Sequence, residues 1–97
     1  MLRKLTSEVE LVGRHLAVVR EVVASQPIGI MKLSEVLGLP AHRVRYSLRV
    51  LESQGYIRAS STGAVATPLA SELVATLDEQ IDDLITMLEL MKQGTIP

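Results

Sequence analysis

The stretch from Met31 to Pro68 constrains the fold of this 97-residue chain more than any other part. Its apolar residues recur at helical spacing on both sides of a Gly38-Leu39-Pro40 turn and then alternate as strand residues do. Glycine permits the left-handed conformation that often follows a helix, and proline presets the first turn of the next helix. The stretch therefore predicts a helix, a tight turn, a longer helix and a β-hairpin, in that order.

Local signals set the bounds that we expect for these elements. The helices are expected over about 32–37 and 41–54, and the strands over 56–59 and 64–67. Gly55 ends the longer helix, and the polar run Ser60-Ser61-Thr62-Gly63 is typical of a hairpin turn. We expect Ile57 and Val65 to face the core.

A long helix is expected before this stretch, from about Ser7 to Ser25. Ser7 and Glu10 have the spacing of a capping box, and Pro27 stops the helical pattern. One heptad stripe consists of Leu5, Val9, Val12, Leu16, Val19 and Val23, and a second row consists of Leu11, Val18 and Val22. One side can therefore cover the chain's own domain while the other meets a partner. The alternative is that both rows are buried within the monomer.

Another long helix is expected after the hairpin, from Thr67-Pro68 to about Gln93. Thr67 offers a hydroxyl cap and Pro68 a first-turn proline, and the helix would be about 37 Å long. Its apolar stripe consists of Leu69, Leu73, Leu77, Ile81, Leu84, Leu88 and Met91. Such a stripe needs a cover, which we expect to be the first helix together with the matching helices of a second chain.

The sequence thus predicts a homodimer. The residues expected at its interface are Leu11, Val18, Val22, Leu77, Ile81, Leu84, Leu88 and Met91. The alternatives are a last helix folded wholly onto its own domain and an apolar groove for the helix of another protein.

Charge is distributed unevenly along the chain, although the formal net charge is only -1. Residues 32–68 hold five cations against two anions, whereas residues 69–97 hold one lysine against six acidic residues. The positive charge therefore lies on the predicted helix-turn-helix and hairpin, and the negative charge lies on another element. For the last helix, a merely solvated acidic face is the alternative interpretation.

The helix expected over 41–54 carries residues suited to DNA. Val44, Leu48 and Leu51 share its inner face, which leaves His42, Arg43, Arg45, Tyr46 and Arg49 on the outer face and its flanks. Arginine matches guanine edges and phosphates with its planar fork. The hairpin adds the DNA-contact candidates Arg58, Ser61 and Thr62. The alternative is that the arginines are ordinary solubilising charge.

Catalytic, metal and cofactor sites are not predicted. The chain has no cysteine, its two histidines are 27 positions apart, and its glycines stand singly, without a phosphate-binding loop. The pair Asp82-Asp83 has no histidine or lysine placed to complete an acid–base set. No apolar run reaches the roughly 20 residues of a membrane span, and the N-terminus turns acidic early, so a cytoplasmic location is expected.

Together these features predict a single domain over residues 1–97. It would consist of an N-terminal helix (1–26), a winged helix-turn-helix core (27–68) and a C-terminal dimerisation helix (69–97). The fold class expected is mainly α with a small β-hairpin wing (α+β), that is, a winged helix-turn-helix flanked by long N- and C-terminal dimerisation helices.

The segment KLSEVLGLPAHRVRYSLRVLESQGYI, followed by the hairpin and TP, resembles a known group of domains. From about Val9 to Pro68 the chain is similar to the winged-helix domains of small prokaryotic, especially archaeal, transcription regulators of the MarR, ArsR and PadR kind. The resemblance implies that the helix over 41–54 enters the major groove, that the hairpin touches the flanking backbone, and that outer helices form a homodimer. The missing cysteines and the short wing mean that no particular signal carries over.

Two functions from different classes follow as expectations. The first is a dimeric, sequence-specific double-stranded DNA-binding transcription regulator. The second is a winged-helix protein-interaction module in transcription, replication or chromosome organisation. A small apolar effector could also bind in a dimer crevice lined by Met87 and Met91, although methionine at helical spacing is more often plain core.

Overall fold

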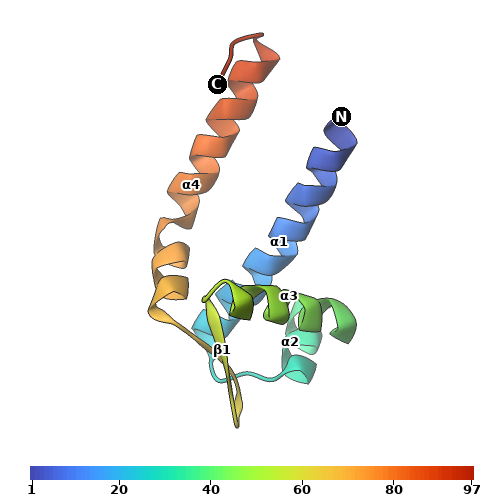
Figure 1. Cartoon of the computed structure of the whole chain (residues 1–97), viewed down its shortest axis with the longest axis vertical. Coiled ribbons are helices and arrows are strands. Elements are labelled where there is room, and N and C mark those ends of the chain that lie inside the picture. Colours follow the sequence, from blue (N-terminus) through green and yellow to red (C-terminus); the bar gives the residue numbers. More distant parts are fainter.

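The computed structural model describes all 97 residues and is mainly helical, with one antiparallel hairpin (Figure 1). The elements are α1 (Leu2–Ser25), α2 (Ile30–Leu37), α3 (Ala41–Ser53), β1 (Ile57–Ser60), β2 (Gly63–Ala66) and α4 (Pro68–Lys92). The tight turn between α2 and α3, followed directly by the hairpin, confirms the predicted winged helix-turn-helix. The bounds of α2 and α3 differ from the predicted ones by two residues or fewer.

The core is aliphatic and lies where the inner half of α1 meets α2, α3 and the hairpin. Leu33 of α2 is completely buried, as are Val18, Val19 and Val22 of α1 and Val44 of α3. Ala70 in the first turn of α4 closes the same cluster. Since all three helices of this unit contribute fully buried side chains, the position of α3 is set by packing on two sides.

The start of α1 differs from the prediction. The helix begins at Leu2, not at Ser7, and the Ser7 side chain forms no cap. Residues 2–6 include no glycine or proline that would stop a helix, and the Thr6 hydroxyl donates to the carbonyl oxygen of Leu2 at 3.1 Å. The capping-box interpretation of Ser7 and Glu10 is therefore wrong, and α1 is one and a half turns longer than expected.

The start of α4 agrees in position with the prediction but not in mechanism. Pro68 occupies the first turn, as expected, whereas the Thr67 hydroxyl makes no cap. It donates instead to the carbonyl oxygen of Gly55 at 2.6 Å, with that of Tyr56 at 3.2 Å. Thr67 thus ties the start of α4 to the segment between α3 and β1 rather than to its own helix.

The hairpin has a register that corrects one prediction. Ile57 pairs with Ala66 and Arg58 pairs with Val65, so Val65 lies on the same face as Arg58. The face that carries the buried Ile57 is completed by Ala64 and Ala66. Val65 therefore does not face the core together with Ile57, and Ala64 takes that role.

The segment between α1 and α2 holds the hairpin in place, which the sequence did not predict. The Ile28 amide donates to the Ala64 carbonyl oxygen at 3.1 Å, and the Ala64 amide donates to the Ile28 carbonyl oxygen at 2.8 Å. The Ala66 amide donates to the Gln26 Oε1 atom at 2.8 Å. Ile28 therefore acts as a third, single-residue strand beside β2.

The outer halves of α1 and α4 extend beyond the core, and both chain ends lie at the same end of the molecule (Figure 1). The Cα radius of gyration is 15.2 Å, against about 13 Å for a compact domain of this length. None of the helices combines the length and apolarity that a membrane crossing requires.

Three residues predicted for a dimer interface lie inside the monomer instead. Val18 and Val22 are fully buried in the chain's own core, and Leu77 is 4% exposed. The second row of α1 thus serves the monomer. The other predicted interface residues retain accessible surface and are partly or largely exposed: Leu11, Ile81, Leu84, Leu88 and Met91.

Candidate nucleic-acid interface

α3 presents a polar outer face because its inner face is used by the core. Val44, Ser47 and Leu51 are buried, which turns the opposite side of the helix to solvent. The residues predicted to contact DNA from this helix are all exposed, namely His42, Arg43, Arg45, Tyr46 and Arg49. One helix therefore displays five groups that can donate hydrogen bonds to phosphates or base edges.

The turn before α3 fixes where this face begins. Gly38 ends α2 in the left-handed conformation, at φ 65°, which glycine adopts without steric cost. The Ser34 hydroxyl donates to the carbonyl oxygen of Leu39, and the amides of Arg43 and Val44 donate to that of Pro40 at 3.0 and 3.2 Å. The first turn of α3 is thus hydrogen-bonded directly to the turn that precedes it.

A polar contact fixes α3 against α1. Ser47 is the only buried polar residue of the chain, and its hydroxyl lies 2.8 Å from His15 Nδ1. The ring of His15 also lies against the ring of Tyr46, with centroids 5.9 Å apart. Sequence reasoning missed this pair, although a serine within the apolar side of a helix signals that a partner is needed.

The partial burial of His15 makes the stability of the fold depend on pH. Burial lowers the pKa of His15 below its usual value of 6.5, and the neighbouring Arg14 charge lowers it further. Between 6.5 and the lower folded pKa, the unfolded chain binds more protons than the folded one, so stability falls as pH decreases through this window. We expect His15→Gln to reduce this loss, as measured by urea unfolding at pH 7 and at pH 5.

The matched control is His42→Gln, which removes an exposed histidine from α3 and leaves the His15 contribution intact. The informative quantity is the difference between each variant and the unchanged protein, measured at both pH values. If the protein and His15→Gln lost equal stability between the two pH values, the partial burial of His15 would have no role in the pH dependence.

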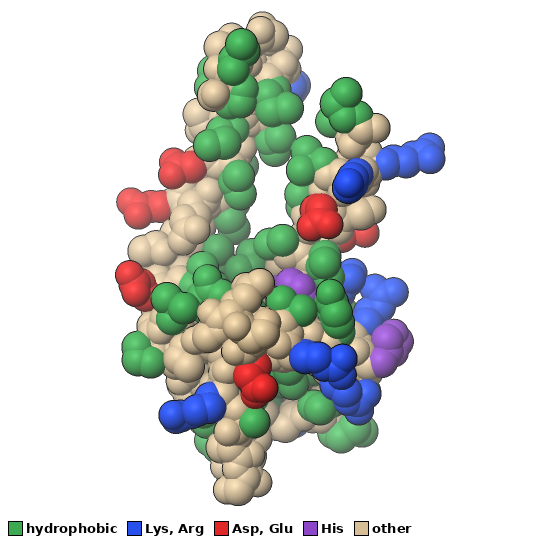
Figure 2. Space-filling view, in the orientation of Figure 1, with side chains coloured by type: hydrophobic (Ala, Val, Ile, Leu, Met, Phe, Trp, Pro, Cys, Tyr) green, Lys and Arg blue, Asp and Glu red, His purple; other side chains and the backbone are tan.

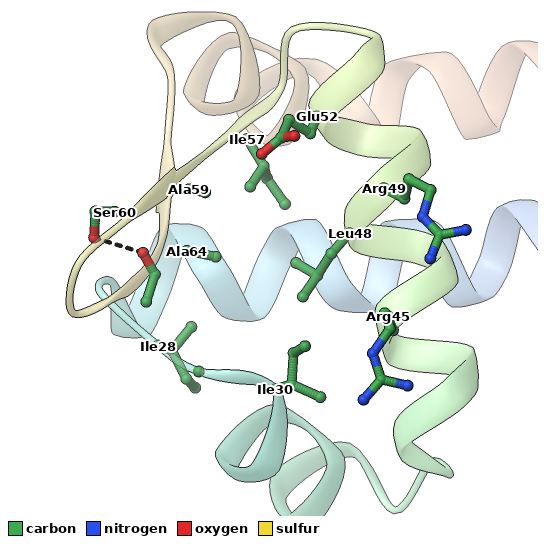
Figure 3. A pocket seen from close by; sticks show the side chains of 12 residues that line it. Ile28, Ile30, Arg45, Leu48, Arg49, Glu52, Ile57, Ala59, Ser60 and Ala64 are labelled. Carbon is green, nitrogen blue, oxygen red and sulfur yellow. Dashed lines mark hydrogen bonds between the residues drawn. The ribbon is translucent and has the colours of Figure 1, made fainter.

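An open cavity of about 440 Å³ separates α3 from the hairpin (Figure 3). Arg45 and Arg49 lie on its α3 side, one helical turn apart, and Ser60 lies on the hairpin side. The side chains between them are mainly apolar, with Leu48 and Ile57 in the middle of the view. The α3 wall of this groove therefore carries Arg45 and Arg49 together with one carboxylate, Glu52. Sequence reasoning did not predict this groove, because it depends on the docking of the hairpin.

The hairpin brings only part of its predicted contacts toward α3. Ser61 and Thr62 form the exposed tip, where the Ser60 hydroxyl donates to the Gly63 carbonyl oxygen at 2.6 Å. Arg58 is exposed but lies on the hairpin face opposite Ile57, away from the groove. The structure thus groups Arg45 and Arg49 and sets Arg58 apart from them.

The cations of α3 have no acidic partners within the chain. The only salt bridge joins Lys32 and Glu35 within α2, at 3.7 Å. In Figure 2 the acidic side chains lie mainly along α4 and the outer part of α1, whereas a cluster of cations lies over α3. The charge on α3 is therefore available to an external anion.

No group of three or more histidine, cysteine or acidic side chains is arranged to hold a metal ion. A comparison with known protein families found no family that matches the chain, and a comparison with curated proteins found no significant match.

Proposed function

We propose that this chain is a sequence-specific double-stranded DNA-binding transcription regulator that acts as a homodimer. In this proposal α3 enters the major groove, and the hairpin lies on the flanking backbone. The observation that carries the proposal is the outer face of α3, which displays exposed arginines without any carboxylate partner. Arginines without a carboxylate partner in the chain can form ion pairs with the phosphates of DNA.

The dimensions of α3 fit this role. Its 13 residues give a helix about 20 Å long, and the major groove of B-DNA admits an α-helix. Arg45 and Arg49 are one turn apart and lie beside the groove between α3 and the hairpin. Guanidinium groups in this position can reach guanine edges or the phosphates that flank them.

The charge balance supports contact through a limited surface. The chain as a whole carries a net charge of -1, and the acidic residues of α4 lie away from α3. Affinity must therefore come from local contacts of α3 and the hairpin rather than from the overall field of the protein. In a dimer, two such helices would meet half-sites about 34 Å apart, one turn of the duplex.

Fluorescence anisotropy over a series of salt concentrations tests the proposal. We expect tighter binding to the duplex upstream of the chain's own gene than to a scrambled duplex of equal length, with affinity that falls steeply as salt increases. Equal affinity for both duplexes would remove the sequence-specific part of the proposal. The absence of binding at low salt would contradict DNA binding altogether.

One observation favours a second candidate function. The groove beside α3 has apolar side chains between its two walls, including Leu48 and Ile57, and an apolar lining also suits a protein segment. Failure of DNA binding at low salt would therefore favour a winged-helix protein-interaction module, to be tested by affinity capture of partners.

A further inference from the structure

Two helical segments of this chain have no counterpart to pack against. We call the outer half of α1, residues 2–12, the N-arm, and the outer half of α4, residues 81–91, the C-arm. Figure 1 shows both arms leaving the core on the same side, and Figure 2 shows hydrophobic side chains along the facing sides of the two arms, with open space between them.

Each arm continues an apolar stripe that the core covers only at its inner end. On α1, Val19 is completely buried, whereas Val12 and Val9 of the same stripe are 49% and 61% exposed. On α4, Leu77 is 4% exposed, whereas Leu84 and Leu88 of the same stripe are 57% and 47% exposed. The exposed part of each stripe consists of the same aliphatic residue types as its buried part. The apolar stripes of α1 and α4 thus extend beyond the part of each helix that the chain's own core can cover.

The exposed area is large enough for a stable interface. The accessible surface is 6871 Å², against about 5,500 Å² for a compact monomer of 10.6 kDa. The excess of about 1,400 Å² is more than the roughly 800 Å² that each partner buries in a standard protein–protein interface. A partner that lies along both arms would reduce the accessible surface of the chain to about that of a compact monomer of the same mass.

The charges at the two ends of the arms indicate how that partner lies. Arg3 and Lys4 are at the tip of the N-arm, whereas the tip of the C-arm carries Glu89 and is followed by Lys92, which have opposite charges. Asp82 and Asp83 are at the base of the C-arm. If the arms of two copies packed with their tips together, the N-arm cations of the two copies would come level with each other, and so would the acidic bases of the two C-arms. If the arms enter tip-first from opposite ends, the N-arm cations of one copy come level with the acidic C-arm base of the other.

We propose that the occupant is a second copy of this chain, and that both arms of each copy pack against both arms of the other, tip-first, as a four-helix bundle. The proposal deepens the homodimer of the proposed function and specifies the surfaces that form it. A second copy supplies apolar stripes of the same length, and a two-fold axis makes the contact isologous and closed. Arg3 and Lys4 of one copy then lie level with Asp82 and Asp83 of the other.

Sedimentation equilibrium without DNA tests the occupant. We expect twice the chain mass of 10.6 kDa for the protein, and a dissociation constant raised about a hundredfold by either Val9→Glu or Leu88→Glu. Each substitution places a charge in the bundle twice, once per copy. Both residues are exposed in the monomer, so circular dichroism should show an unchanged helical content.

The matched controls are Ser7→Glu and Thr86→Glu, which add the same charge to each arm about 200° around the helix from the stripe. These variants should remain dimeric. A monomeric protein would overturn the proposal, and so would dissociation by only one of the two stripe variants, because the other arm would then lie outside the interface. Dissociation of the control variants would also overturn the proposal, because a charge outside the apolar stripe would then disrupt the dimer as well as a charge within it.

A charge-reversal pair tests the tip-first orientation without adding a charge to the stripe. Asp82→Lys with Asp83→Lys should weaken the dimer severalfold at low salt, and adding Arg3→Glu with Lys4→Glu should restore it. Lack of restoration would overturn the tip-first orientation. None of these measurements uses DNA, so the two proposals can fail separately. A dimer that does not bind DNA would contradict the proposed function but not this inference. A monomer that binds DNA would contradict the dimer but not the assignment of α3 as the helix that contacts DNA.

Discussion

Replacing Gly63 by alanine is expected to lower the free energy of unfolding by about 3 kcal/mol. A Cβ atom at this position would lie 2.6 Å from the Ile28 carbonyl carbon and 2.8 Å from its oxygen. Both are backbone atoms, so no side-chain rotation relieves the contact. The φ angle of Gly63 is also 132°, a conformation that other residues rarely adopt.

The loss has two parts. Moving β2 away from Ile28 breaks the two amide hydrogen bonds between Ile28 and Ala64, which contribute about 1 kcal/mol each. The alanine would in addition hold a backbone conformation that costs about 1–3 kcal/mol for a residue with a side chain. Marginal stability is usual for a domain of this size, so a change of this magnitude removes a large share of the total.

Urea unfolding at one fixed protein concentration measures the effect. The matched control is Gly13→Ala, because Gly13 lies within α1 and a Cβ atom there would have no neighbouring atom within 4 Å. This control should gain up to about 1 kcal/mol of stability from the higher helix propensity of alanine. The two glycine-to-alanine changes should therefore have opposite signs. If Gly63→Ala were as stable as the protein itself, the hairpin would not be held against Ile28.

The helix-turn-helix and the existence of the hairpin could be predicted from local signals. Gly38 and Pro40 mark the turn, and the apolar spacing in α3 separates Val44 and Leu51 from the arginines. These signals depend only on residues close together in the sequence, so they can be interpreted without knowledge of the rest of the fold. The exposure of Arg45 and Arg49 followed directly from the same spacing.

The hairpin register could not be predicted in the same way. Ala64, Val65 and Ala66 are three consecutive apolar residues, so alternation within this strand does not decide whether Val65 or the alanines face the core. The preference for Ala64 comes from its pairing with Ile28, a residue 36 positions earlier that belongs to no regular strand. A single-residue bridge leaves no alternating pattern in the sequence.

The division of each long helix into a buried part and an exposed part is likewise determined by tertiary packing and could not be predicted from local sequence. The stripe that includes Val19 and Val9 continues without a change in residue type, yet only its inner end meets the core. The prediction that Val18 and Val22 meet a second chain was therefore wrong, since both side chains fill the monomer core. Where the core ends depends on how far α2, α3 and the hairpin extend along α1.

The pair of substitutions Arg45→Ala and Arg49→Ala is expected to weaken binding to the specific duplex at least about 30-fold. A bidentate arginine–guanine contact contributes roughly 1–3 kcal/mol of discrimination, and the two side chains lie one turn apart on the same side of α3. Both are exposed and neither forms a salt bridge, so stability should change by less than about 0.5 kcal/mol per substitution.

Anisotropy titrations against specific and scrambled duplexes distinguish two roles for these arginines. Loss of a base contact reduces the preference for the specific duplex, whereas loss of a phosphate contact weakens both duplexes equally and lowers the salt dependence by about one ion per residue. Arg20→Ala is the matched control for each single variant, because it removes one exposed positive charge from α1. If Arg20→Ala weakened binding as much as Arg45→Ala or Arg49→Ala, DNA would respond to the overall charge of the protein, and α3 would lose its assignment as the reading helix.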